Sequence, residues 1–337
     1  RIDYTGGEGH WLFEPQSTNL ETESAALTTG WNVRTGATSQ IQTSTTPFGV
    51  SGNVYKLTNA TNNPPSWTDN SNSTKKQYAV SATDPASFYT FSVYVKSAGS
   101  TTINIQLRDN SRGSFVTTGL ISLSSEWQRV TISKQFTTST TAVGVVIAGT
   151  DGDILLADAQ FEQQSFATSY IPTNGSTVTR LKDAAFGAGN SSLINSTEGV
   201  LYVEVAALAE QTLTRYITLS SGASSNRIII YITDVGVIKF FVGVGGVTQA
   251  AKTVSGQTTT NFNKLAVSYK ENDIKFYLNG VKVHTDTSAS TFPADTLNVL
   301  NFAASNGTSS PFFGKTKCAA VFKEALTDAE LTCLTTI

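Results

Sequence analysis

Cysteine and histidine are scarce in this chain of 337 residues. The only cysteines are Cys318 and Cys333, and two cysteines without a nearby histidine cluster do not supply the four ligands of a zinc site. They either pair as a disulfide or remain two buried thiols. The only histidines are His10 and His284, and the chain has no Gly-X-Ser-X-Gly motif, so nothing in it indicates a nucleophilic triad.

Charge is also low. The 23 basic and 25 acidic residues form no run of one sign and leave a formal net charge of −2. A nucleic-acid partner or an anionic membrane surface would require a basic face, so a neutral partner such as a glycan fits better. No apolar stretch reaches the ~18 residues of a membrane-spanning helix, so we expect no membrane insertion. Arg1-Ile2-Asp3-Tyr4 carries neither an initiator methionine nor a signal peptide, which suggests a longer or processed precursor.

Paired catalytic carboxylates are not evident either. Glycoside hydrolases of the concanavalin A-like kind carry Glu-X-Asp-X-X-Glu on one strand, and this spacing does not occur in the chain. A polysaccharide lyase needs a base near a cation, and nothing in the sequence orients Tyr94, Lys96 and Arg108 for that role. We therefore expect a protein without glycosidase or polysaccharide lyase activity.

Ser, Thr, Asn and Gly are abundant, and aromatic residues make up 10% of the chain. This mixture is typical of many short strands joined by polar turns, and the length fits two domains of roughly 150 residues each. Apolar and polar residues alternate at Phe91, Val93 and Val95 and again over 103–107. We expect these two runs to pair as an antiparallel hairpin with one polar face.

The second half holds the strongest local signals. Asn279-Gly280 lies between two alternating runs and predicts a hairpin with a type I′ turn. Near the end, Thr327 and Glu330 form a capping box for a short helix. The fold class predicted is all-β, with two tandem antiparallel β-sandwiches of jelly-roll type and a short C-terminal helix. The expected boundaries are an irregular lead-in over 1–20, a first domain over 21–172, a linker over 173–197 and a second domain over 198–337.

Two surfaces of the first domain have the chemistry that suits sugars. If the two alternating runs pair, Tyr94, Gln106 and Arg108 share the polar face, where a ring, an amide and a guanidinium could meet sugar hydroxyls. The polar loop around Trp67 adds an indole beside Asp69 and Asn70. The alternatives are a solvated outer sheet face and a tryptophan that only packs its loop. Trp31 and Trp127 sit next to strand residues, and we expect both in the core.

Several segments resemble known families. Trp11-Leu12-Phe13-Glu14-Pro15-Gln16-Ser17-Thr18-Asn19-Leu20 and the later Ala167-Thr168-Ser169-Tyr170-Ile171-Pro172-Thr173 resemble the opening and the close of a jelly-roll domain found in phage tail fibres and adhesins. Phe88–Lys96 and Glu126–Val130 resemble strands of jelly-roll carbohydrate-binding modules. Phe276-Tyr277-Leu278-Asn279-Gly280 and the segment 320–331 resemble a concanavalin A-like, laminin-G-like lectin domain, over about 196–337.

Such modules often hold a structural Ca²⁺ with oxygens from their first and last strands. The candidate ligands in this chain are Asn19, Glu21, Glu23 and Asp158. The alternative is that these residues are surface carboxylates and an aspartate at the edge of the core.

The resemblance implies a non-catalytic protein of the virion surface or the extracellular space, which binds a cell-surface glycan or polysaccharide as part of a homo-oligomeric phage tail fibre. Two alternatives stay open. The chain is an ancillary binding region of a secreted polysaccharide-degrading enzyme, or it is a structural filament subunit that binds no sugar. Apolar side chains on outer faces would mark the last, and the residues to inspect are Phe240, Phe241, Phe312 and Phe313.

Overall fold

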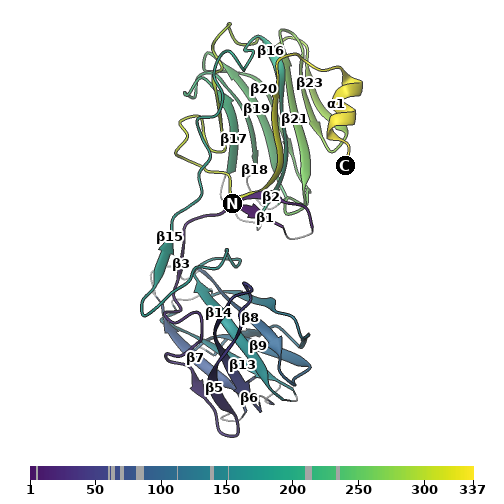
Figure 1. Ribbon diagram of the computed structural model, residues 1–337. Helices are drawn as coiled ribbons and strands as arrows, with labels where there is room; N and C mark the ends of the chain where they lie inside the picture. The colour runs from purple at the N-terminus through teal and green to yellow at the C-terminus, as the bar shows by residue number, and fades with distance from the viewer. Residues whose placement is uncertain are drawn as a thin grey trace. The chain divides into compact units, whose positions relative to one another are not determined.

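The computed structural model describes residues 1–4, 7–59, 61, 65–68, 72–80, 87–111, 113–136, 140–150, 152–208, 215–232 and 236–337. Strands dominate these residues, and the one helix among them is α1, Asp328–Thr335, at the C-terminus (Figure 1). The all-β fold class with a short C-terminal helix is thereby confirmed. In the described part of the chain, no helix has the length and apolar character needed to span a membrane.

The chain forms two compact units. Unit 2 is one continuous segment, Gln16–Leu181, whereas unit 1 combines Arg1–Pro15 with Lys182–Ile337. The two ends of unit 2 pair with each other, because β3 (Ser17–Asn19) lies antiparallel to β15 (Val178–Arg180). The chain therefore leaves unit 1, builds unit 2 and returns.

Besides the two-stranded sheet of β3 and β15, the described part of unit 2 contains two larger sheets, each named after one of its inner strands. The β9 sheet has the strand order β10-β9-β13-β7-β4, with β11 also paired to β9: β10 Phe115–Thr117, β9 Thr102–Asp109, β13 Ala142–Gly149, β7 Thr74–Ala79, β4 Asn32–Val33 and β11 Ile121–Ser122. The β8 sheet has the order β12-β8-β14-β6-β5: β12 Gln128–Gln135, β8 Phe88–Ser97, β14 Ile154–Glu162, β6 Ser51–Thr58 and β5 Thr38–Thr45.

The core of unit 2 lies between these sheets. Phe91, Val93 and Val95 of β8 and the apolar residues of β9 at 103, 105 and 107 are all fully buried in one cluster, which also contains Trp31. The expected hairpin between the two runs was wrong, because β8 and β9 belong to different sheets. Alternation shows which face of a strand is buried, but it does not show whether the next strand pairs beside it or packs across the core from it.

Unit 1 is also a sandwich of two sheets. The β16 sheet has the order β1-β2-β25-β16-β21-β22-β23: β1 Ile2–Asp3, β2 His10–Phe13, β25 Gly314–Phe322, β16 Glu198–Ala207, β21 Asn263–Lys270, β22 Ile274–Leu278 and β23 Val281–Asp286. The β18 sheet has the order β20-β19-β18-β17-β24: β20 Val247–Val254, β19 Ile238–Val244, β18 Arg227–Ile232, β17 Arg215–Ser220 and β24 Val299–Asn301.

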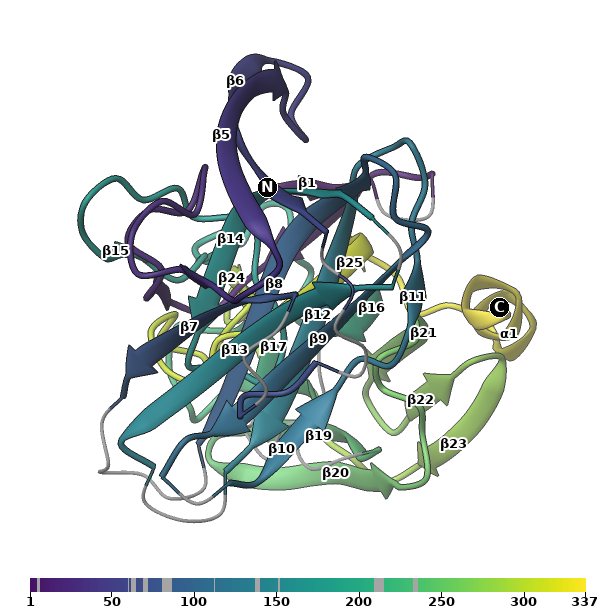
Figure 2. The same ribbon diagram turned by 90° about the horizontal axis from the view of Figure 1, so that it is seen from below.

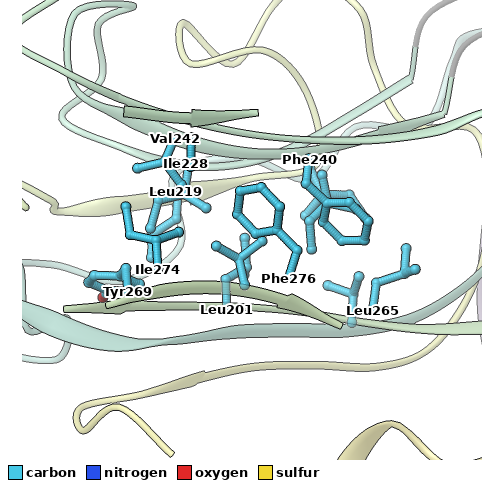
Figure 3. Close-up of a cluster of buried hydrophobic side chains, with 14 of the residues drawn as sticks. Leu201, Leu219, Ile228, Phe240, Val242, Leu265, Tyr269, Ile274 and Phe276 are labelled. Atoms are coloured by element: carbon cyan, nitrogen blue, oxygen red, sulfur yellow. The ribbon is translucent and has the colours of Figure 1, made fainter. Parts of the chain in front are cut away.

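Aromatic and branched side chains fill the space between the two sheets of unit 1. Figure 3 shows Phe240 and Val242 from the β18 sheet opposite Leu201, Leu265 and Phe276 from the β16 sheet. The rings of Phe240 and Phe276 stack with their centroids 5.2 Å apart. Each fully buried side chain of this kind contributes about 1.5–3 kcal/mol to folding.

The two local predictions for the second half are confirmed. Asn279 and Gly280 join β22 to β23, and both have positive φ (49° and 81°), as a type I′ turn requires. The helix α1 begins after Thr327, whose side chain and that of Glu330 form the expected capping box. Figure 2 shows α1 alongside β22 and β23, and Leu331 anchors it on the outer face of the β16 sheet.

The expected lead-in and linker are structured parts of the two units. Residues 1–20 hold β1, β2 and β3, and the first two of these strands extend the β16 sheet of unit 1 through β25. Within 173–197, β15 pairs with β3, and Ile194 is buried in the core of unit 1. These strands have only two to four residues, too short for alternation to stand out in the sequence.

Candidate functional site

The outer face of the β9 sheet carries most of the sugar-type chemistry in unit 2. Since the odd-numbered apolar residues of β9 face the core, Gln106 and Arg108 point outward. The registers place cross-strand neighbours in two rows: Phe115, Arg108, Gly144 and Gln77 in the first, and Thr117, Gln106, Val146 and Lys75 in the second.

The indole of Trp67 lies against Gly144 in the first row. A Cβ added at Gly144 would be only 2.5 Å from Cζ3 of Trp67 and 2.7 Å from Oδ1 of Asn110. The ammonium of Lys75 lies 4.4 Å from the centre of the Trp67 ring and donates a hydrogen bond of 2.8 Å to the Trp67 carbonyl. The missing side chain at Gly144 therefore makes the space that the ring occupies, and Lys75 holds the loop at this place.

Three polar side chains around the ring each have one buried atom without a hydrogen-bond partner among the described residues. Gln106 donates from Nε2 to the Pro65 carbonyl at 2.9 Å, and Asn110 donates from Nδ2 to Gln77 at 2.8 Å. The amide oxygens of these two side chains, Gln106 Oε1 and Asn110 Oδ1, are buried and have no hydrogen-bond partner among the described residues. The same is true of Nε of Arg108. Buried polar atoms are normally paired, so these three atoms are exceptions in this part of the chain.

The local charge is positive. The pKa of Lys75 is lowered from its usual value, first by partial burial and then by the nearby positive charges of Arg34 and Arg108. Burial and like charge both disfavour the protonated ammonium, so the two effects act in the same direction.

We call Trp67, Lys75, Gln77, Gln106, Arg108 and Phe115 the Trp67 face. It presents an indole and an exposed phenyl ring, 55% accessible at Phe115, beside amides and a guanidinium. Rings of this kind pack on the apolar side of a sugar, while amide and guanidinium groups exchange hydrogen bonds with its hydroxyls.

The structure brings together three of the six glycan residues predicted from sequence. Trp67, Gln106 and Arg108 all belong to the Trp67 face, whereas Asp69 and Asn70 lie outside the described residues. Tyr94 is in a different place. It lies on the outer face of the β8 sheet, because β8 packs across the core from β9. The centre of its ring is 5.6 Å from the centre of the Phe48 ring and 5.7 Å from Cζ of Arg129.

Sequence reasoning missed several members of the face. Lys75 and Gln77 alternate with the buried Thr74, Lys76 and Tyr78 in β7, but a buried lysine hides this alternation from a hydrophobicity pattern. Gly144 gave no signal, because its role depends on a tryptophan 77 positions away in the chain. Phe115 belongs to a three-residue strand without a readable period.

The proposed calcium ligands Asn19 and Glu21 are held by protein donors. Oδ1 of Asn19 accepts from the backbone amides of Glu21 and Phe161, both at 3.0 Å. The carboxylate of Glu21 is fully buried, accepts from Lys76 Nζ at 2.6 Å and from the Glu23 amide at 3.0 Å, and faces two further donors: Trp31 Nε1 at 3.1 Å and the Tyr78 hydroxyl at 2.7 Å.

A cation does not fit at these residues, because it would displace the Lys76 ammonium from Glu21. Glu23 and Asp158 do not complete a cluster with them, since the described residues hold no group of three or more His, Cys, Asp or Glu side chains placed to bind a metal. Burial and the charge of Glu21 raise the pKa of Tyr78, so this hydroxyl remains a donor to the carboxylate. Asn19 Nδ2 donates to the Ile171 carbonyl at 2.9 Å and Thr173 Oγ1 donates to the Glu21 carbonyl at 2.6 Å, so this cluster of residues joins the start of unit 2 to its end.

Asp158 occupies an unusual backbone position beside this cluster. Its φ is 53°, at a bulge of β14 between Ala157 and Gln160, and its Oδ2 is buried with no partner in the described part of the chain. Burial raises the pKa of Asp158 to about 6, and a hydrogen bond from Tyr170 opposes part of this rise. Tyr170 in turn shares a hydrogen bond of 2.6 Å with Ser24.

This raised pKa predicts how stability changes with pH. The folded protein binds the Asp158 proton more tightly than the unfolded chain, whose carboxyl titrates near 3.8, so the contribution favours folding at low pH and is lost as the pH rises from about 4 to about 6. Asp158→Asn keeps a residue that tolerates positive φ and should stabilise unit 2 at pH 7 by about 1 kcal/mol, because partial solvent screening weakens the effect. Urea unfolding at pH 4 and pH 7 measures the difference.

The control is Asp153→Asn in the same unit. The hydrogen bond to Lys56 lowers the pKa of Asp153, so removing this carboxylate should reduce stability near neutral pH instead of raising it. An Asp158→Asn variant whose stability falls equally at both pH values would contradict the assignment to Asp158.

Comparison with solved structures finds matches of low sequence identity and low TM-score. The carbohydrate-binding module (CBM40) of the Ruminococcus gnavus IT-sialidase, bound to α2,3-sialyllactose, shares 18% sequence identity over 46% of this chain and 97% of its own, with a TM-score of 0.37. A heptameric SAP-like pentraxin from Limulus polyphemus shares 11% sequence identity over 44% of this chain and 72% of its own, with a TM-score of 0.34. Sheep galectin-11, in complex with glycerol, shares 9% sequence identity over 42% of this chain and 100% of its own, with a TM-score of 0.30.

No protein matched in the comparison with curated proteins. Among family models, that of the concanavalin A-like lectin/glucanases superfamily matches residues 201–332, which is less than half of the chain and lies entirely within unit 1. The two-sheet architecture of this unit agrees with that match. Residues 201–332 of this chain thus have a concanavalin A-like β-sandwich fold.

Proposed function

We propose that this chain binds glycans through the Trp67 face of unit 2. The observation that carries the proposal is the placement of the Trp67 ring against Gly144, next to Gln106 and Arg108 on one sheet face. An aromatic ring fixed by its surroundings loses little conformational freedom when a ligand packs on it.

The polar atoms of the face complement sugar hydroxyls in both directions. The exposed side-chain amide of Gln77 can both accept from and donate to a hydroxyl, whereas the guanidinium of Arg108 can only donate. A hydroxyl both donates and accepts, so neighbouring hydroxyls of one sugar would satisfy both groups. This pairing would orient the ring on Trp67 and give specificity.

The match of residues 201–332 to a lectin/glucanase family model supports a carbohydrate-related role for the chain as a whole. The match concerns unit 1. It therefore supports a carbohydrate as the class of ligand, but it does not support the Trp67 face as the place where the ligand binds. A fold can host unrelated functions, and for that reason the proposal rests on the site.

Four phenylalanines bear on the alternative of a filament subunit without sugar binding. Phe240 and Phe312 are buried in the core of unit 1. Phe241 is half-buried on the outer face, where the guanidinium of Arg227 lies 5.3 Å from its ring, and Phe313 is half-buried. Two of the four side chains that would have formed an apolar outer surface are thus core residues, which favours the binding function.

The setting of this binding is a further proposal. We infer that the glycan belongs to a cell surface or an extracellular polysaccharide and that the chain works outside the cell or on a virion, as a homo-oligomer that gains avidity from repeated sites. The resemblance of the segments around Trp11 and Tyr170 to tail-fibre domains supports it. Measuring the mass of the chain in solution distinguishes an oligomeric fibre from a monomeric ancillary module of an enzyme.

A glycan array tests the proposed function with the full chain and a Gly144→Ala variant. The added methyl must push the Trp67 ring from its place without removing any polar group, so we expect about tenfold weaker binding to the glycans that the unchanged chain selects. The double variant Gly144→Ala with Trp67→Ala serves as control: once the ring is absent the methyl keeps only its close contact with Asn110 Oδ1, so its further effect should be smaller than in the unchanged chain. An array on which the unchanged chain binds no glycan would overturn the proposal.

A further inference from the structure

Unit 1 contains a pocket of about 200 Å³ beside its two N-terminal strands. Tyr4, Gly9, His10 and Trp11, from β2 and the residues around it, line one part of the pocket, and Thr316 of the neighbouring strand β25 lines another. The Trp67 face is in unit 2, so this pocket is separate from it.

Two aromatic side chains of the pocket are accessible. Trp11 is 54% exposed and Tyr4 is 67% exposed, although large aromatic side chains contribute most to stability when they are buried. Gly9 gives the Tyr4 ring its place, because a Cβ at this glycine would lie 2.9 Å from Cε1 of Tyr4. A glycine thus lies beneath an aromatic ring here as well, as Gly144 does beneath Trp67.

A buried hydroxyl adjoins these rings. Thr316 is the cross-strand neighbour of Trp11, is only 1% exposed and lines the pocket. Its Oγ1 has no hydrogen-bond partner among the residues that the structure describes. A buried hydroxyl without a hydrogen-bond partner is unfavourable, and a ligand hydroxyl would supply the missing partner.

The charged groups around the pocket are already paired. Asp3 lies between His10 Nε2 at 3.3 Å and Lys315 Nζ at 2.8 Å. Lys317 lies 3.6 Å from Glu8 and 3.8 Å from Glu204. Lys315 and Lys317 each already have a carboxylate within 4 Å, which favours a neutral ligand over an anionic one.

We propose that this pocket is a second ligand site, which takes one neutral sugar ring. Two accessible aromatic rings and an unpaired hydroxyl match the apolar side and the hydroxyls of such a ring. The volume is below the roughly 300–1,000 Å³ of pockets for drug-sized ligands, which fits a single ring. The proposal does not depend on the Trp67 face, and two weak sites on one chain would raise its avidity for an extended glycan.

Fluorine NMR of the full chain labelled with 5-fluorotryptophan tests the pocket. The chain has four tryptophans, so four signals report on it, and single Trp→Phe variants assign them. The probes are the methyl glycosides of β-galactose, β-glucose and α-mannose at millimolar concentration. We expect at least one of them to shift the Trp11 signal in a saturable manner and to leave the signal of the buried Trp31 unchanged.

The matched variant is Thr316→Val. It keeps the shape of the side chain and removes only the unpaired hydroxyl, so the fold should persist while the affinity at Trp11 falls roughly tenfold. A Trp11 signal that none of the three glycosides shifts overturns the pocket proposal. Shifts at Trp67 alone would leave the proposed function in place without the second site, and shifts at Trp11 alone would support the pocket and count against the Trp67 face.

Discussion

Replacing Trp67 by alanine is expected to weaken glycan binding about ten- to a hundredfold. The indole and the exposed Phe115 ring are the two aromatic surfaces of the face, and tryptophans that become buried on binding commonly contribute about 2 kcal/mol or more. Lys75 would also lose the ring beneath its ammonium. Isothermal titration with the strongest glycan from the array measures the change.

Tyr94→Ala is the matched control for this experiment. Tyr94 is also an aromatic residue on a sheet of unit 2, but it lies on the outer face of the β8 sheet against Phe48. We expect binding to remain within about twofold of that of the unchanged chain, because no group of the Trp67 face contacts it. If Tyr94→Ala abolished binding and Trp67→Ala preserved it, the site would have to be moved to the other sheet.

Replacing Glu21 by glutamine is expected to destabilise unit 2 by about 3–5 kcal/mol. The substitution leaves the Lys76 ammonium, whose side chain is 9% exposed, buried without its carboxylate. Trp31 and Tyr78 would lose a charged acceptor at the same time. Urea unfolding followed by tryptophan fluorescence measures this loss, because three of the four tryptophans lie in unit 2.

Two further variants show whether the loss comes from the buried charge. Adding Lys76→Met to Glu21→Gln removes the uncompensated ammonium and should recover at least half of the lost stability. Lys56→Met breaks the more exposed pair with Asp153 in the same unit and should reduce stability by no more than about 1 kcal/mol. Equal losses from Glu21→Gln and Lys56→Met would contradict the assigned role of the cluster.

The features that sequence predicted well are local. The turn at Asn279-Gly280 and the cap at Thr327 depend on residues within a few positions of each other, and the chemistry of each favours one backbone conformation. The all-β class likewise follows from the alternation of short runs. None of these features requires knowledge of which strand lies next to which.

Long-range pairing was harder to predict. Trp11 and Phe13 belong to a four-residue strand that pairs with β25, about 300 positions further along the chain. The split of unit 1 around unit 2 therefore leaves no local pattern in the sequence. The predicted hairpin of β8 and β9 failed for a related reason. Apolar and polar residues alternate both in strands that pair side by side and in strands that face each other across a core.

The candidate site was predictable in part. Trp67 stood out as an indole in a polar loop. Gln106 and Arg108 stood out because they alternate with the apolar residues of β9 and so point to its other face. The calcium ligands were not supported, because the sequence could not show that Lys76 lies 2.6 Å from Glu21. Carboxylates that bind a metal and carboxylates that bind a lysine look the same in a sequence.

A crystal structure of the full chain with the strongest glycan from the array tests the central claim most directly. The account predicts a sugar ring packed on Trp67, with its hydroxyls within hydrogen-bond distance of the Gln77 amide and the Arg108 guanidinium. A glycan bound to unit 2 away from these three residues, or bound only outside unit 2, would contradict it.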